Sequence, residues 1–262
     1  MRRSLVLFAL AACGDDAVTP EQPDASLGTP SIVGTPVSSF ESTSCATSVV
    51  LPLSVQIAEE VDCLMPGQLV PFAESAEIVF SGSAVLPYLS EVARAQLIEA
   101  AATGAGSAVK VTSAFRTVAQ QYLLRRWFEL GRCGITAAAE PGRSNHESGR
   151  ALDISNYSEW ITTFAAHGWS HDVPGDPVHF DHTASPDIRG ADIMAFQRLW
   201  NRNAPEDPIA EDGSYGAMTE ERLARSPAEG FGIGAICGAA RVAPVPPPAV
   251  DLTSDRSLEC AD

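Results

Sequence analysis

Two histidines and an aspartate form the first pattern in this sequence that suits metal chemistry. His146 and Asp153 lie seven residues apart in SNHESGRALDI, and Gly149 between them permits a turn. His179 follows in GDPVHFDH. Catalytic zinc sites use three imidazole or carboxylate ligands of this kind and leave a fourth position for water. The sequence therefore predicts a zinc site made by His146, Asp153 and His179.

Three short motifs around these residues resemble those of the D-Ala-D-Ala metallopeptidases. The pattern S-x-H-x-x-G-x-A-x-D is complete at residues 144–153. An acidic residue three positions before a histidine and an aromatic residue is found at 176–180, and S-[GA]-[YF]-R-[ST] followed by glutamine at 113–121. The motifs stand in the family's order. The resemblance implies a hedgehog-like, D-Ala-D-Ala-peptidase-like zinc domain that hydrolyses an amide in the stem peptide of peptidoglycan.

The resemblance also implies a role for each of the other matched residues. Asp176 is expected to act as general acid and base, and Arg116 to offer positive charge to the substrate or to the oxyanion. Ser144 and Gln121 are expected to position the substrate. These four residues complete the predicted site.

One departure from the family bears on the bond that is cut. The D-Ala-D-Ala enzymes usually carry glutamate at the base position, whereas this sequence has Asp176. Aspartate there is similar to the related endolysins that cut between L-Ala and D-Glu. We expect a D-alanyl-D-alanine carboxypeptidase, with an L-Ala-D-Glu endopeptidase as the alternative. A catalytically inactive lipoprotein that binds peptidoglycan is the alternative from another functional class.

Other titratable residues near the motifs are expected to lie outside the site. In a strand, His182 would point away from the face that carries His179. His167 and His171 are predicted to be surface or packed residues. Glu147 is expected to be exposed, although it is adjacent to a predicted ligand.

Helices and short strands alternate around the predicted ligands. Three segments have the composition or the apolar spacing of helices: residues 86–101, 117–130 and 160–166. Three others are predicted to be short strands: residues 108–113, 151–154 and 178–181. This mixture, joined by long loops, predicts an α+β fold with a small antiparallel sheet and flanking helices, not a doubly wound sheet.

A small helical unit is predicted at residues 187–231. AFQRLWNRN, EDGSYG and MTEERLARS predict two helices joined by a turn, and together they are similar to the peptidoglycan-binding repeat. The residues that match are Phe196, Gln197, Asp212, Gly213, Gly216 and Thr219. The alternative is a helical cap on the catalytic domain. Residues 232–262 are expected to form a proline-rich tail.

The N-terminal residues predict export. Two arginines precede a short apolar run, as in a secretory signal. LAAC at residues 10–13 resembles a lipobox, in which Cys13 would carry lipid and anchor the protein to a bacterial membrane, facing the periplasm or cell wall. The alternative is an ordinary signal peptide with a chance cysteine. Residues 1–13 are assigned to the signal, 14–43 to an unstructured linker and 44–186 to the zinc peptidase domain.

Charge and cysteine content narrow the possible partners further. The formal net charge of -16 would repel nucleic acid, which is excluded as a partner. Beyond Cys13 there are five cysteines, and none forms a C-x-x-C pair that would hold zinc: Cys45, Cys63, Cys133, Cys237 and Cys260. Cys45 and Cys63 would form the most local disulfide, and Cys133 could pair with Cys237 or Cys260. The sequence leaves the pairing open.

Overall fold

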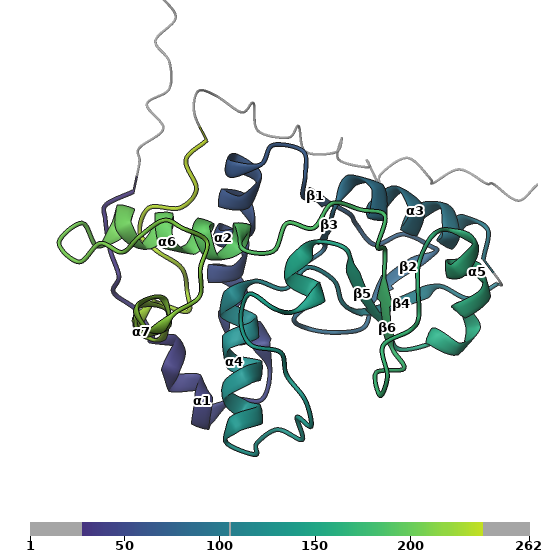
Figure 1. The fold of residues 1–262 in the computed structure, drawn as a ribbon, viewed down its shortest axis with the longest axis horizontal. Coiled ribbons are helices and arrows are strands. Elements are labelled where there is room, and N and C mark those ends of the chain that lie inside the picture. The colour runs from purple at the N-terminus through teal and green to yellow at the C-terminus, as the bar shows by residue number, and fades with distance from the viewer. Residues whose placement is uncertain (1–27, 105, 238–262) are drawn as a thin grey trace, which may run out of the picture.

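The computed structural model describes residues 28–104 and 106–237. Figure 1 shows two regions side by side, a small sheet with two helices beside it and a group of longer helices. The predicted α+β class is confirmed. Cys13 and the tail from residue 238 onward lie outside the described residues. No helix in the described part of the chain has the length and apolar character needed to cross a membrane.

A four-stranded sheet carries two of the three predicted ligands, Asp153 and His179. Its strands, in spatial order, are β2 (Ile78–Phe80), β4 (Val109–Ser113), β5 (Ala151–Ile154) and β6 (His179–Asp181). The register places Asp153 opposite Ser113 on one side and opposite His179 on the other. A row across three strands therefore brings an aspartate and a histidine from distant segments together.

The four-stranded sheet is mixed, and a small antiparallel sheet stands beside it, as predicted. β2 runs parallel to β4, whereas the other two pairs are antiparallel. A separate antiparallel pair joins β1 (Val70–Pro71) and β3 (Tyr88–Leu89). The sequence analysis missed β1, β2 and β3 because two or three residues are too short to show a period.

Two helices cover the sheet, α3 (Glu91–Ala102) and α5 (Ile161–Ala166). Their apolar side chains form one core with the buried faces of the strands, and its larger members are Leu97, Val111, Leu152, Trp160, Phe164 and Phe180. Short 3-10 turns, η3 (Asn145–Ser148) and η4 (Tyr157–Glu159), flank β5. Burial of these side chains fixes the strands from which the site projects.

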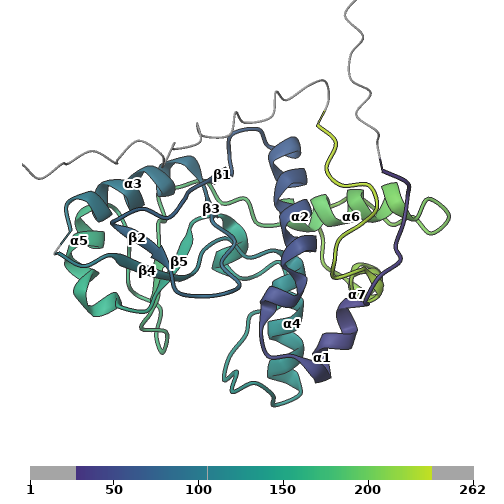
Figure 2. The ribbon, with the colours of Figure 1, turned by 180° about the vertical axis from the view of Figure 1, so that it is seen from behind.

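The second region is a set of helices with a core of its own. Its elements are η1 (Val37–Ser39), α1 (Phe40–Thr43), η2 (Thr47–Val50), α2 (Leu51–Leu64), α4 (Val118–Glu129), α6 (Ala191–Asn203) and α7 (Ala217–Arg225). Leu53, Ile57, Leu123, Trp127, Phe196 and Trp200 are among the buried residues of this one core. Figure 2 shows α2 crossing in front of α6. Residues 187–231 thus pack as a helical cap on the rest of the chain.

Most of the residues shared with the peptidoglycan-binding repeat hold the turn between α6 and α7. Gln197 is buried, and its Oε1 accepts hydrogen bonds from the backbone N–H groups of Asp212 and Gly213 at 3.0 and 2.9 Å. Its Nε2 donates to Thr219 Oγ1 at 3.2 Å. These contacts show that the matched residues stabilise the turn between the two helices.

The folded body begins before residue 44, where the linker was predicted to end. Val37 is fully buried, and its backbone N–H donates to Ser226 O at 3.0 Å. Ala228 N–H donates to Thr35 O at 2.9 Å, and Gly232 N–H donates to Ser31 O at 3.1 Å. The segment at 31–37 is ordered because it pairs with residues that follow α7, a partner almost 200 positions away that composition does not reveal.

Two disulfides connect distant segments, Cys45–Cys133 and Cys63–Cys237. The local pairing of Cys45 with Cys63 is wrong, and so is the pairing of Cys133 with a C-terminal cysteine. Cys63 lies near the C-terminal end of α2, a 14-residue helix that begins after Cys45. A helix of that length spans about 21 Å, far beyond the Cα separation that a disulfide can bridge.

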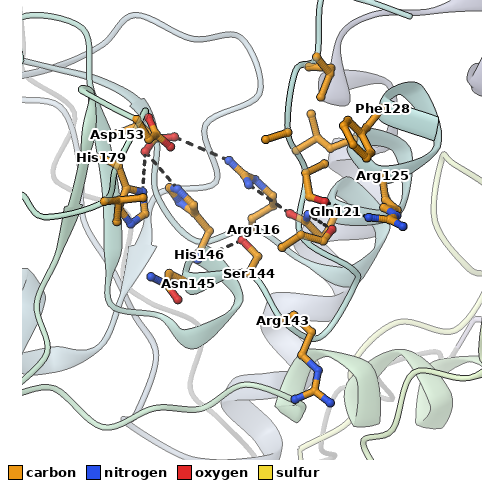
Figure 3. A pocket seen from close by; sticks show the side chains of 17 residues that line it. Arg116, Gln121, Arg125, Phe128, Arg143, Ser144, Asn145, His146, Asp153 and His179 are labelled. Atoms are coloured by element: carbon orange, nitrogen blue, oxygen red, sulfur yellow. Dashed lines mark hydrogen bonds and ion pairs between the residues drawn. The ribbon is translucent and has the colours of Figure 1, made fainter. Parts of the chain in front are cut away.

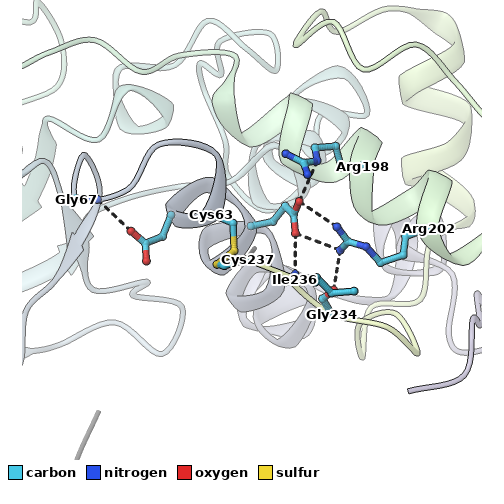
Figure 4. The surroundings of a disulfide bond; sticks show 9 residues. Cys63, Gly67, Arg198, Arg202, Gly234, Ile236 and Cys237 are labelled. Atoms are coloured by element: carbon cyan, nitrogen blue, oxygen red, sulfur yellow. Dashed lines mark hydrogen bonds and ion pairs between the residues drawn. A yellow bond between two sulfur atoms is a disulfide. The ribbon is translucent and has the colours of Figure 1, made fainter. Parts of the chain in front are cut away.

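The second disulfide ties the end of the described chain to α2, beside a buried ion cluster (Figure 4). Glu60, fully buried, pairs with Arg198 and Arg202 of α6 at 3.1 Å each. Because the bridge closes 174 positions of chain, replacing both cysteines by serine should lower the free energy of unfolding by about 2–5 kcal/mol. Urea denaturation without reductant measures the change, and an unaltered midpoint would contradict it.

Candidate active site

The structure brings the three predicted ligands together at the edge where the two regions meet. His146 Nε2 and His179 Nδ1 each lie 3.1 Å from Asp153 Oδ1. One donor atom from each residue lies within 4.8 Å of the other two. Figure 3 shows the three side chains pointing toward one another from the η3 turn, β5 and β6. We call these residues the ligand cluster.

In each histidine, the ring nitrogen that faces away from Asp153 lies close to an oxygen acceptor. His146 Nδ1 lies 2.7 Å from Ala114 O, so Nδ1–H donates to this carbonyl and leaves the Nε2 lone pair for a metal. His179 Nε2 lies 3.2 Å from Asp181 Oδ1, which leaves Nδ1 facing Asp153. Each imidazole therefore presents the correct nitrogen to the same point.

The ligand cluster fits a zinc ion. Ligand atoms about 2.0–2.2 Å from one tetrahedral centre stand roughly 3.3 Å apart, close to the two separations of 3.1 Å from Asp153. His146 and His179 are 4% exposed, so the protein rather than water must satisfy their nitrogens. Two neutral imidazoles and a carboxylate are a donor set that zinc prefers.

The members of the ligand cluster shift one another's pKa values. Burial alone would raise the pKa of Asp153, but His146, His179 and Arg116 together hold it well below its usual range. Burial opposes protonation of His179, yet Asp153 and Asp181 raise its pKa to about 9. Burial lowers the pKa of His146.

The turn that carries His146 is fixed by its own capping groups. Ser144 Oγ accepts a hydrogen bond from His146 N–H at 3.3 Å, and Glu147 Oε2 accepts from Ser144 N–H at 3.0 Å. Gly149 ends the turn with φ of 72°, a conformation that L side chains rarely adopt. The spacing from Ser144 to Gly149 in the motif is therefore the spacing of a capped turn.

Glu147 is fully buried, which corrects the expectation that it is exposed. Its Oε1 accepts a hydrogen bond from Gly142 N–H at 2.8 Å. Burial raises the pKa of Glu147, and so does its neighbour Asp192, a second fully buried carboxyl group on α6. Burial likewise raises the pKa of Asp192 to about 7. Glu147 is buried because its carboxylate accepts hydrogen bonds from backbone N–H groups at the start of the turn.

Replacing Asp192 by asparagine should make the protein more stable at pH 8 than the wild type. The folded-state pKa of Asp192 is raised, so its favourable contribution is complete below about pH 4 and is lost as the pH rises through about 7. The wild type should lose up to about 1.4 kcal/mol per pH unit relative to Asp192→Asn in this window. Urea denaturation at pH 5 and pH 8 measures the difference; a wild type that gains stability relative to the variant would contradict it.

Arg116 stands beside the ligand cluster and is held in place by neutral partners. Its Nη1 donates to Gln121 Oε1 at 3.1 Å and its Nη2 donates to Ser113 Oγ at 3.2 Å. Asp153 Oδ2 is 3.7 Å from Nη2. Gln121 Nε2 in turn donates to Ala139 O at 2.8 Å, which ties the 131–143 loop to α4.

A cleft of about 700 Å³ opens over the ligand cluster. All seven predicted site residues of the peptidase domain line it: Arg116, Gln121, Ser144, His146, Asp153, Asp176 and His179. Asp176 is partly exposed and precedes β6, whose first residue, His179, donates its N–H to Asp176 O at 3.3 Å. Contact of Ser144 and Gln121 with substrate stays a prediction.

The sequence analysis missed two residues that support the ligand cluster. Asn145 Nδ2 donates to Asp181 Oδ2 at 2.7 Å, and Asp181 faces His179. Asp181 follows His179 by two positions in a strand, so both side chains must share one face. That alternation was available in the sequence. His182 points the other way, as predicted, and its Nδ1 lies 2.8 Å from Ser185 Oγ.

Residues 89–173 match the model of the VanY family, described as D-alanyl-D-alanine carboxypeptidase. This segment is similar to that family. It includes Arg116, His146 and Asp153. Asp176 and His179 follow it along the chain and line the same cleft. No curated protein matches the chain. The expected resemblance to D-Ala-D-Ala metallopeptidases is confirmed for this segment.

Proposed function

We propose that the protein is a zinc metallopeptidase that removes the terminal D-alanine from peptidoglycan stem peptides. The observation that carries this proposal is the ligand cluster, which opens into the same cleft as Arg116 and Asp176. The match to the VanY family supports the reaction class. A cleft of about 700 Å³ suits a peptide longer than a free dipeptide.

Each cleft residue has a distinct part in the proposed reaction. His146, Asp153 and His179 would hold zinc, which when bound polarises the scissile carbonyl and lowers the pKa of water. Asp176 would accept the proton of the attacking water and pass it to the leaving amine. Arg116, already oriented by Gln121 and Ser113, would present positive charge without reorganisation.

Incubation of the zinc-loaded protein with muramyl pentapeptide and with intact muropeptides tests the proposal. Mass spectrometry of the products should find free D-alanine and a tetrapeptide. Release of a peptide that begins with D-glutamate, with no D-alanine, would replace the proposal by the L-Ala-D-Glu endopeptidase, which the aspartate at position 176 favours. A protein that binds zinc and cell wall but releases neither would be the inactive binder.

We also propose that the protein is exported and anchored by lipid on Cys13. Two disulfides within the described chain support an oxidising compartment. Metabolic labelling with an alkyne fatty acid should tag the wild type and not a Cys13→Ser variant. Equal labelling of the two would remove the anchor from the proposal.

A further inference from the structure

A second hollow lies beside the active-site cleft, between the 131–143 loop and the helical cap. This hollow, of about 480 Å³, is formed by residues 140–143, 189–190 and 213–215, together with Ile193. Arg143 lines both spaces. Figure 3 shows its side chain beyond Ser144, with the guanidinium pointing away from the ligand cluster. A ligand held at the ligand cluster could therefore extend past Arg143 toward α6.

Three glycines form part of the wall of the hollow. Gly190 and Gly213 face each other with φ of 91° and 69°. A Cβ on Gly213 would lie 2.9 Å from Gly190 O, closer than real contacts allow. Gly142 (φ 82°) is equally tight, since its Cβ would lie 2.8 Å from Ile193 Cδ1. These two close approaches require glycine at positions 142, 190 and 213.

Arg143, at the rim of the hollow, has no protein partner for its guanidinium among the residues that the structure describes. Its side chain is exposed, and no hydrogen bond, ion pair or ring contact engages its guanidinium. Arg189, on the opposite side, is bound to Asp187 through Nε at 3.0 Å. Glu140, the acidic residue of the hollow, has its carboxylate 3.8 Å from Arg125 Nη2. In a chain of net charge -16, an unpaired arginine beside the cleft attracts an anion.

We propose that Arg143 and the hollow form a subsite for a carboxylate of an extended peptide substrate, outside the two residues that flank the cut bond. This proposal rests on the proposed function, because the peptide must also reach the ligand cluster. Stem peptides offer two such groups, the α-carboxylate of D-glutamate and the side-chain carboxylate of diaminopimelate. The guanidinium fork binds either one with two parallel hydrogen bonds. The helical cap is then part of the substrate site.

Arg143→Gln should separate long from short substrates. For L-Ala-γ-D-Glu-meso-diaminopimelyl-D-Ala-D-Ala, the variant should show about a tenfold higher KM with kcat nearly unchanged, because the lost contact is made equally in the ground state and the transition state. For diacetyl-L-Lys-D-Ala-D-Ala, which lacks both carboxylates, KM should stay within about twofold. Arg143→Lys should fall between the wild type and Arg143→Gln, because it keeps the charge and loses the fork.

Substrates that lack one of the two carboxylates identify which of them is bound. Changing D-glutamate to D-isoglutamine, or diaminopimelate to lysine, should raise KM of the wild type about tenfold for one of the two changes and leave Arg143→Gln insensitive to it. Lys110→Gln is the matched control, since Lys110 is exposed on β4 and lines neither space. It removes the same charge and should behave as the wild type.

Equal effects of Arg143→Gln on long and short substrates, or no effect on either, would overturn the subsite. Direct binding of fluorescent tetrapeptide product provides a readout that does not depend on turnover. Arg143→Gln should weaken this binding about tenfold, and identical binding would also overturn the subsite. A wild type that binds the peptide but cleaves nothing would reject the proposed function and leave the subsite supported.

Discussion

Replacing His146 by alanine should abolish peptide hydrolysis and metal binding together. His146 supplies one of three nitrogen or oxygen donors around a single point, and its loss leaves two, too few to hold zinc tightly. We expect kcat/KM to fall by at least about a thousandfold, which corresponds to about 4 kcal/mol of transition-state stabilisation. Elemental analysis should find about one zinc per chain in the wild type and far less in the variant.

His167→Ala is the control for this experiment. His167 lies at the end of α5, where its Nδ1 is 2.8 Å from Thr163 O, and it does not line the cleft. It should keep both zinc and activity. A His146→Ala variant that retains full zinc content would contradict the ligand cluster, and one that retains activity without zinc would contradict a metallopeptidase altogether.

Asp176→Asn should lower kcat while leaving zinc bound. Asp176 lines the cleft but is not part of the ligand cluster, so its carboxylate is available for proton transfer rather than for coordination. Loss of a general base typically lowers the rate by about 10²–10⁴-fold. Asparagine keeps the size of the side chain and removes its basicity. Steady-state kinetics with pentapeptide, together with zinc analysis of the same sample, measures both effects.

A second carboxylate in the same loop separates proton transfer from a general effect of charge. Asp172 is exposed and does not line the cleft, so Asp172→Asn should leave kcat unchanged. Loss of zinc from Asp176→Asn would make this residue a ligand. An unchanged kcat would move the role of base to another group.

Local patterns predicted the elements that carry the site. β5 occupies 151–154 as expected, because a capped turn and Gly149 determine where the strand must begin. Helix α4 follows Thr117, whose hydroxyl and Gln120 form a capping box. Helix α2 was not predicted, although it is one of the longest. Its apolar side chains share a core with those of α6, which lies more than a hundred residues later.

The ligand cluster was predictable for the same reason, whereas the buried carboxyl group beneath it was not. His146, Asp153 and His179 belong to short motifs with fixed spacing, so residue type was sufficient. The burial of Glu147 depends on Asp192 and on the approach of Gly142 to α6, contacts between segments that no local pattern relates. The disulfide pairing was left open for a similar reason, because each bridge joins segments that lie far apart along the chain.

The pairing of residues 31–37 with residues 226–232 has a consequence for the order of folding. During synthesis from the N-terminus, α2 appears early, but α6, residues 226–232 and Cys237 are added only when nearly all of the chain has been made. The second region therefore cannot complete its fold while these residues are still being synthesised. It remains incomplete until translation of the last of these residues, and a nascent protein halted before them would be left open to proteases.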